Sequence, residues 1–104
     1  MVINVVNKKS FKGDGIYVAR PSIFGNPFPI LDFNRAECIR KYATWFEGQL
    51  ANDSFKSSLD SLYEIAKKGE LNLVCWCHPK ECHATVIKRY LEKRYKMEVE
   101  HGRL

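Results

Sequence analysis

The stretch Leu71–Lys88, LNLVCWCHPKECHATVIK, decides the fold of this 104-residue chain. Its first part, Leu71–Cys77, is a short apolar run of the kind that forms a buried strand. A four-residue turn at His78–Glu81 follows, and Cys82–Thr85 then opens a helix whose apolar residues recur at helical spacing. Strand, loop and helix form half of the unit from which open α/β sheets are built, and such sheets bind ligands beyond the carboxyl ends of their strands. We therefore expect the functional site where this strand meets this helix.

The remaining segments supply the other elements of an α/β domain. Val2–Val6 and Ile16–Ala19 predict two strands, which either pair as an antiparallel hairpin or lie as neighbours. Helices are expected at Arg35–Leu50 and from Ser54 or Phe55 to Lys68. The C-terminal segment Lys96–Leu104 is expected to be an edge strand or a loose tail. The sequence thus predicts a small Rossmann-like domain at residues 1–104, with two or three layers, a short sheet of three or four strands and about three helices.

The first helix carries the clearest local signals. Asn34 is suited to cap its N-terminus, with Glu37 three residues later. Cys38 is expected to be a small buried hydrophobe. The residues expected to face the core are Ala36, Ile39, Ala43, Phe46 and Leu50.

Composition limits the classes of protein to which the chain can belong. No apolar run approaches the roughly 20 residues of a membrane span, and the start of the chain is unlike a signal peptide. We expect a cytoplasmic protein without a membrane partner, whose four cysteines are thiols or metal ligands rather than disulfides. No cofactor is indicated. The formal net charge of +5 favours an anionic partner, either a nucleotide, a nucleic acid or an acidic protein.

A long apolar loop, Arg20–Ile30, separates the second predicted strand from the first predicted helix. Three prolines and a Gly-Asn pair exclude regular helix over most of it. Because the loop carries several large apolar side chains, it must fold back on the core or line a pocket. Gly25 allows the main chain to approach a bound group closely, and the amide of Asn26 both donates and accepts.

The favoured interpretation of the two segments together is a site for a small anionic, nucleotide-derived ligand. Arg20 offers a bidentate phosphate contact, and the helix N-terminus at Cys82, His83 and Ala84 suits an anion. Aromatic side chains beside such a site stack on bases. The full set of predicted ligand-binding residues is Arg20, Phe24, Gly25, Asn26, Phe28, Trp76, Cys77, Cys82, His83 and Ala84. In a regular strand Trp76 faces opposite to Cys75 and Cys77, so these three side chains cannot all line one pocket.

Three other interpretations of the cysteine-rich junction remain open. Cys82 at a helix N-terminus is expected to have a lowered pKa, as in a thiol nucleophile with His83 beside it. Alternatively, the chain is an enzyme that hydrolyses or cleaves a nucleotide or nucleotide-sugar with one of its carboxylates. The third interpretation is a zinc-stabilised, nucleic-acid-associated module, although Cys-x-Cys in a strand holds its sulfurs farther apart than usual zinc spacings. The carboxylates considered are Asp14, Asp32 and Glu81, and the zinc ligands considered are Cys75, Cys77, Cys82 and either His78 or His83.

Two motifs carry a resemblance to a known family. Gly15–Phe28, GIYVARPSIFGNPF, and Leu73–Ile87, LVCWCHPKECHATVI, resemble an uncharacterised family of small domains of unknown function that is common in phages and bacteria. Its signature is GNPF followed by CWCxPxxCHxxVI. Where some members have Gly-Asp after the Cys-His pair, this chain has Ala84–Thr85. The second motif is also similar to the strand–loop–Cys-His–helix ending of other Rossmann-like families, which implies nucleotide or nucleotide-sugar ligands.

The functional hypothesis combines the charge, the two motifs and the resemblance. We expect the protein to bind its ligand between the Arg20–Phe28 loop and the Cys77–Thr85 junction. Because the resembled family is frequent in phages, one biological form is the sequestration of a host immune signalling nucleotide. Nucleic acid is a less favoured partner, and whether the chain forms a homo-oligomer is left open.

Overall fold

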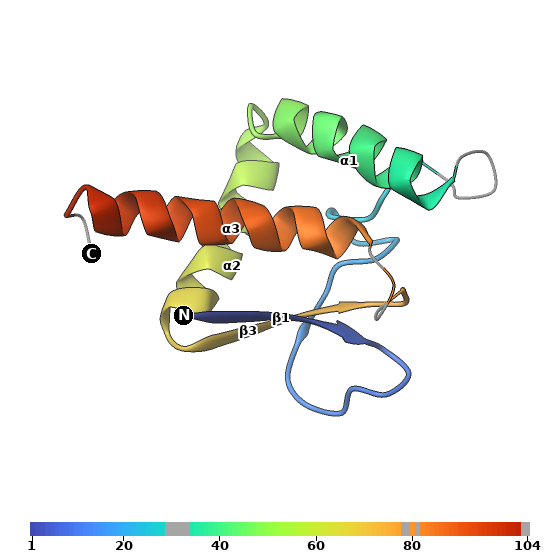
Figure 1. The fold of residues 1–104 in the computed structure, drawn as a ribbon, viewed down its shortest axis with the longest axis horizontal. Helices are drawn as coiled ribbons and strands as arrows, with labels where there is room; N and C mark the ends of the chain where they lie inside the picture. The colour runs from blue at the N-terminus through green and yellow to red at the C-terminus, as the bar shows by residue number, and fades with distance from the viewer. Residues whose placement is uncertain (29–33, 78–79, 81, 103–104) are drawn as a thin grey trace.

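The described residues form a small α/β fold whose sheet has three parallel strands. The computed structural model describes residues 1–28, 34–77, 80 and 82–102 (Figure 1). Strands β1 (Val2–Asn7), β2 (Ile16–Tyr17) and β3 (Glu70–Cys75) lie in the order β1-β3-β2. The expected pairing of the first two strands, as a hairpin or as neighbours, is therefore wrong. β3 takes the central position, where both of its edges are paired.

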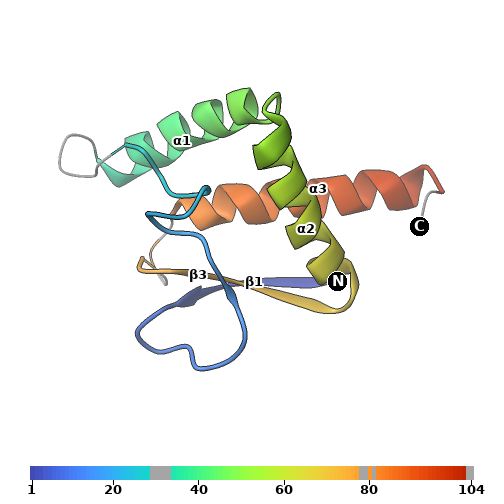
Figure 2. The same ribbon diagram turned by 180° about the vertical axis from the view of Figure 1, so that it is seen from behind.

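Three helices cover one side of this sheet. They are α1 (Arg35–Gln49), α2 (Asp53–Lys67) and α3 (His83–Glu100). In both views the helices lie on the same side of the strands, with α1 farthest from the sheet (Figures 1 and 2). The sequence predicts either two or three layers, and the described residues form two, one of strands and one of helices. Among these residues no helix is long and apolar enough to cross a membrane.

The core lies between the sheet and the helices. Along β3 the side chains of Leu71, Leu73 and Cys75 are buried, whereas those of Asn72 and Val74 are only half-buried. This alternation shows that one face of the strand carries most of the burial, as expected for a sheet with helices on one side. The helices contribute a cluster of aromatic rings in edge-to-face and tilted contacts: Tyr42, Trp45, Phe46, Phe55 and Tyr90.

The predicted helix boundaries are nearly those observed, with one exception. The side chain of Asn34 accepts a hydrogen bond from the Glu37 amide and caps α1, as predicted. The C-terminal segment that was expected to be an edge strand or a loose tail instead continues α3 as far as Glu100. Met97 and Val99 lie in this part of α3, and both side chains are about half exposed.

The buried face of α1 also differs from the predicted stripe. Cys38, Tyr42 and Phe46 are buried, whereas Ala36 is exposed and Ile39 is only partly buried. The face is rotated because Tyr42 is accommodated in the core, where its hydroxyl donates a hydrogen bond of 2.7 Å to the Phe24 carbonyl. The prediction that Cys38 is a buried hydrophobe is confirmed.

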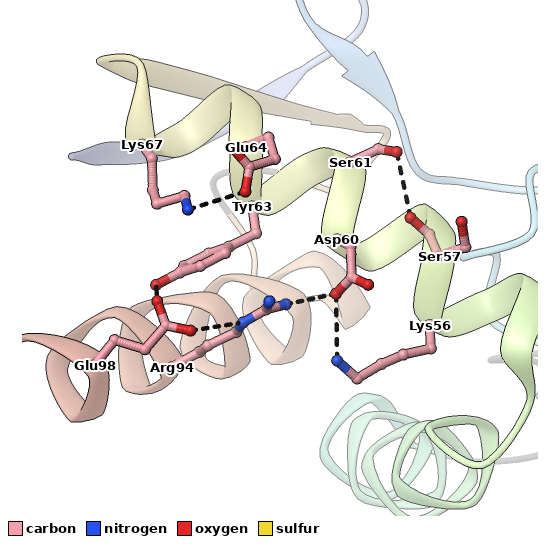
Figure 3. Close-up of polar contacts among 9 residues, drawn as sticks. All are labelled: Lys56, Ser57, Asp60, Ser61, Tyr63, Glu64, Lys67, Arg94 and Glu98. Atoms are coloured by element: carbon pink, nitrogen blue, oxygen red, sulfur yellow. Dashed lines mark hydrogen bonds and ion pairs between the residues drawn. The ribbon is translucent and has the colours of Figure 1, made fainter. Parts of the chain in front are cut away.

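Polar contacts connect α2 with the C-terminal half of α3 (Figure 3). Arg94 on α3 donates to Asp60 on α2 at 2.7 Å, and the Tyr63 hydroxyl on α2 donates to Glu98 on α3 at 2.5 Å. The guanidinium of Arg94 also lies 4.1 Å from the centre of the Tyr63 ring. Since α3 is a straight rod of about 27 Å, these contacts also help to fix the position of its first turn.

Candidate ligand-binding site

A cavity of about 240 Å³ lies beyond the carboxyl ends of the strands. Because all three strands are parallel, their last residues Asn7, Tyr17 and Cys75 meet at one edge of the sheet. This edge is where open α/β sheets bind their ligands. The described residues that line the cavity are Tyr17, Ala19, Arg20, Asn26, Phe28, Arg35, Cys38, Ile39, Trp76, Cys77, Cys82 and His83.

The proline-rich loop forms one wall of the cavity. Two tight turns fold it back, since the Ser22 amide donates to the Ala19 carbonyl and the Gly25 amide donates to the Ser22 carbonyl, both at 2.9 Å. These turns bring Gly25 against Arg20 so closely that a Cβ on Gly25 would lie 2.9 Å from the Arg20 Cα. Asn26 then accepts a hydrogen bond from the Phe28 amide through its own side chain. The expectation that this loop and the start of the last helix share a cavity is confirmed.

Trp76 stands at the rim of the cavity with its indole ring held in place. The strand ends at Cys75, so the alternation expected from a regular strand no longer applies and both Trp76 and Cys77 line the cavity. The indole N–H donates to the Tyr17 hydroxyl at 2.9 Å, and this hydroxyl donates to the Arg20 carbonyl at 2.7 Å. Trp76 remains 49% exposed. Its ring therefore offers an accessible, oriented apolar surface.

The first turn of α3 opens onto the cavity. Cys82 is the N-cap residue, but its side chain makes no capping hydrogen bond, and the first turn contains no acidic residue. The first amides of a helix have no partner within the helix and carry the positive end of its dipole. Arg20 and Arg35 also line this space, and the described lining residues include no aspartate or glutamate. The electrostatics of the cavity therefore favour an anion.

His83, the first residue of α3, is 7% exposed and is held by two contacts. Its Nε2 lies 2.7 Å from the Val18 carbonyl oxygen, and its ring meets the edge of the Tyr42 ring at 5.2 Å between centroids. Burial lowers the pKa of His83 below its usual value of 6.5. The hydrogen bond to Val18 opposes this decrease in pKa, whereas the positive charge of Arg20 adds to it. His83 is therefore a neutral imidazole at neutral pH.

The environment of Cys82 contradicts the expected reactive thiol. Its Sγ lies 3.4 Å from the Sγ of Cys75, to which it donates a weak hydrogen bond, and it is 3% exposed. The hydrogen bond to Cys75 and burial raise the pKa of Cys82 well above its usual range. The prediction of a lowered pKa at the helix N-terminus is therefore wrong, because the hydrogen bond to Cys75 and burial together outweigh the helix dipole. A thiol kept protonated is a poor nucleophile.

Seven of the ten predicted ligand-binding residues line the cavity, and three do not. Phe24 is buried in the core, where its ring packs edge-to-face on Phe55. Gly25 shapes the loop without lining the space, and Ala84 is fully buried under the first turn of α3. The predicted residues that line the cavity are Arg20, Asn26, Phe28, Trp76, Cys77, Cys82 and His83.

Five lining residues were missed by sequence reasoning. Tyr17 ends β2, and its position at the carboxyl end of a parallel strand would have identified it had the strand direction been known. Ala19 lies two residues after the end of β2. The other three lie on α1 and required the tertiary structure, because this helix reaches the cavity only after the loop has folded back. They are Arg35, Cys38 and Ile39.

The other expected chemistries are less well supported by the geometry. Among the described residues no three His, Cys, Asp or Glu side chains are placed to hold a metal ion. His78, Asp32 and Glu81, which were considered as ligands or catalytic groups, lie outside the described residues. A second, larger groove of about 570 Å³ runs between α1 and α3, remote from the strand ends, and carries charges of both signs, among them Lys93 and Glu47.

A comparison with known protein families supports the resemblance seen in the sequence. The family described as "Domain of unknown function (DUF4326)" matches residues 3–93. The chain belongs to this family. Because the match covers both β1 and most of α3, the DUF4326 region includes every element of the sheet and all described residues of the cavity. No curated protein and no solved structure matches the chain.

Proposed function

We propose that this protein binds a small anionic, nucleotide-derived ligand in the cavity at the carboxyl end of its sheet. The observation that carries the proposal is the single space shared by the Arg20–Phe28 loop and the first turn of α3. Arg20, Arg35 and the start of α3 border this space, and its described lining residues include no aspartate or glutamate. Phosphate is the anion that such an arrangement suits best.

The shape and the aromatic rim favour a nucleotide over a simple anion. A cavity of about 240 Å³ exceeds the space that one phosphate needs, yet it is smaller than the roughly 300–1,000 Å³ of sites for drug-sized ligands. Trp76 and Phe28 line the same space as Arg20, so a base can stack there while its phosphate contacts the guanidinium. A compact mononucleotide or one half of a larger nucleotide matches this combination.

The resemblance to a phage-rich family suggests one biological form of this binding. A domain that holds a nucleotide tightly without changing it can sequester a host immune signal. The alternative is an enzyme that hydrolyses or cleaves a nucleotide or a nucleotide-sugar. The buried, protonated Cys82 argues against a mechanism in which a thiol attacks the ligand. Hydrolysis by other groups in the cavity is the second candidate function.

The test is to incubate the purified protein with AMP, cyclic nucleotides and ADP-ribose derivatives, remove unbound material, denature the protein and identify what is released. Our proposal requires that at least one nucleotide is retained and released intact. Release of a cleaved product would show the enzyme instead. If no nucleotide is retained above the level seen with a non-binding control protein, the proposal is wrong.

Arg20 offers a sharper test of the same site. Hydrogen bonds to charged groups contribute about 1.5–3 kcal/mol, so the Arg20→Gln variant should bind the retained nucleotide about 10- to 100-fold more weakly in calorimetry. Arg40→Gln removes the same charge from an exposed position of α1 outside the cavity and serves as the matched control. An equal loss in both variants would indicate a general charge effect and contradict the assigned site.

A further inference from the structure

His83 brings to the cavity an imidazole with one nitrogen engaged and one available. Its Nε2 lies 2.7 Å from the Val18 carbonyl oxygen. A carbonyl cannot donate, so Nε2 carries the hydrogen, and in the neutral ring Nδ1 is then an acceptor. No described residue forms a hydrogen bond to Nδ1. Among the described residues, Ser22 Oγ is the only fully buried side-chain nitrogen or oxygen without a hydrogen-bond partner. Nδ1 of His83 is therefore not both fully buried and unpaired. His83 lines the cavity, and Nδ1 is the ring nitrogen that remains to interact with a ligand there.

This acceptor sits at the place where an anion is expected to bind. His83 is the first residue of α3, next to the uncapped helix start, and the charge of Arg20 acts on its ring. A phosphate oxygen without a proton is itself an acceptor and cannot pair with Nδ1. A ligand that leaves Nδ1 unpaired would incur a penalty, because a buried acceptor without a partner is costly. The ligand therefore has to bring a hydrogen-bond donor beside its anionic group.

In a nucleotide the group between the phosphate and the base is the sugar, whose hydroxyls are donors. We propose that Nδ1 of His83 accepts a hydrogen bond from a sugar hydroxyl, so that the cavity selects ribonucleotides over deoxyribonucleotides and inorganic phosphate. This inference rests on the proposed function and names its ligand class and one specificity-determining residue. Trp76 and Phe28 then face the base, and Arg20 faces the phosphate.

The experiment is a calorimetric comparison of AMP and ADP-ribose with their 2′-deoxy and 3′-deoxy forms. In the native protein we expect the loss of one sugar hydroxyl to weaken binding at least tenfold, while inorganic phosphate binds more weakly than either parent nucleotide. In His83→Leu the side chain has neither a donor for the Val18 carbonyl nor an acceptor in the place of Nδ1. This variant should bind the ribo and deoxy forms equally. His101→Gln, on an exposed histidine outside the cavity, should keep the native preference.

A merely structural role of His83 would weaken both ligand forms alike and leave their ratio unchanged, so a preserved preference in His83→Leu overturns the inference. Equal binding of ribo and deoxy forms by the native protein also overturns it while leaving the proposed function intact. A preference for AMP over IMP that depends on His83, without any effect of the sugar, would assign the donor to the base instead. If none of these nucleotides binds, the proposed function itself falls, and this inference with it.

A spectroscopic measurement keeps the test independent of the folding of the variant. In ¹⁵N-labelled native protein, the Nδ1 resonance of His83 should shift when AMP or ADP-ribose is added. The deoxy form that lacks the recognised hydroxyl should leave this resonance near its free position. Equal shifts with both forms would contradict the assignment of Nδ1 as the acceptor.

Discussion

His83 illustrates how a single buried side chain can serve the fold and the site at once. Its Nε2 connects the start of α3 to Val18, the residue directly after β2, and its ring packs on Tyr42 of α1. Burial disfavours the charged form of the ring, although the hydrogen bond to Val18 opposes this effect. Because burial has the larger effect on the pKa, the stability of the fold depends on pH.

We predict that stability falls as the pH is lowered below about 6.5. Burial puts the pKa of His83 in the folded chain below its usual value of 6.5, so between the two values the unfolded chain binds a proton that the folded chain does not. Unfolding is therefore favoured progressively, by up to about 1.4 kcal/mol per pH unit. Urea titrations between pH 7.5 and 5.5 measure this slope. The range ends above the region where carboxylates titrate.

The His83→Gln variant is the control for this pH effect. It retains a donor for the Val18 carbonyl but has no titrating ring, so its free energy of unfolding should be flatter over the same pH range. His101→Gln should behave like the native protein. A slope that persists unchanged in His83→Gln would assign the proton uptake to another group and contradict the prediction.

At the scale of elements, the proline-rich loop depends on one glycine more than on its prolines. A Cβ at Gly25 would lie 2.8 Å from Arg20 Cγ, 2.9 Å from its Cα and 3.0 Å from its backbone nitrogen. Two of these atoms belong to the backbone and cannot rotate away. Gly48, near the end of α1, is the opposite case, since nothing lies within 4 Å of its Cβ position.

We therefore predict opposite effects for alanine at the two glycines. Gly25→Ala should destabilise the fold by about 1–3 kcal/mol, as overpacked positions do, and should weaken nucleotide binding because the loop moves away from the cavity. Gly48→Ala should stabilise by up to about 1 kcal/mol, because alanine favours a helix over glycine, and should leave binding unchanged. Thermal and urea unfolding measure the first effect and calorimetry the second. Equal stability of the two variants would show that the loop does not pack against Arg20 as described.

The sequence predicted those features of the elements that arise from contacts between residues close along the chain. Asn34 caps α1 through a contact three residues away, so the sequence alone identified it. The rotated buried face of α1 depends on the hydrogen bond from Tyr42 to Phe24, which are far apart along the chain. The apolar pattern gave no sign of this bond. The order of the strands was missed for the same reason, since β1 and β2 both pair with a strand more than fifty residues later.

The site shows the same division between local and tertiary causes. The motif around Cys82 and His83 predicted where the cavity lies, because ligand sites of α/β sheets follow from strand direction. It mispredicted the state of Cys82, since the neighbouring Cys75 sulfur and burial raise the pKa of a thiol that a helix start alone would lower. Phe24 was expected to contact the ligand, but its ring instead packs edge-to-face against Phe55 in the core.

For the whole molecule, the main consequence is that the cavity joins segments that are distant in sequence. Its described walls come from the end of β2 and the following loop, from the first turns of α1, and from the β3–α3 junction. A ligand in this space touches all three at once. The ligand should therefore stabilise the native state as a whole rather than order one loop. The increase in the free energy of unfolding follows from the concentration and affinity of the ligand.

We predict that the retained nucleotide raises the free energy of unfolding by about 2.7 kcal/mol when its concentration is one hundred times its dissociation constant. Hydrogen exchange should slow together at residues 17–28, at residues 35–39 and at the described residues 76, 77, 82 and 83, since each of these segments contributes to the lining of the cavity. The C-terminal half of α3 around Arg94 and Glu98, which packs on α2 instead, should change only through the global gain. Arg20→Gln, measured at the same nucleotide concentration, should show a smaller response in all three segments. Slowed exchange confined to the groove between α1 and α3 would place the ligand there and rule out the cavity at the strand ends as its site.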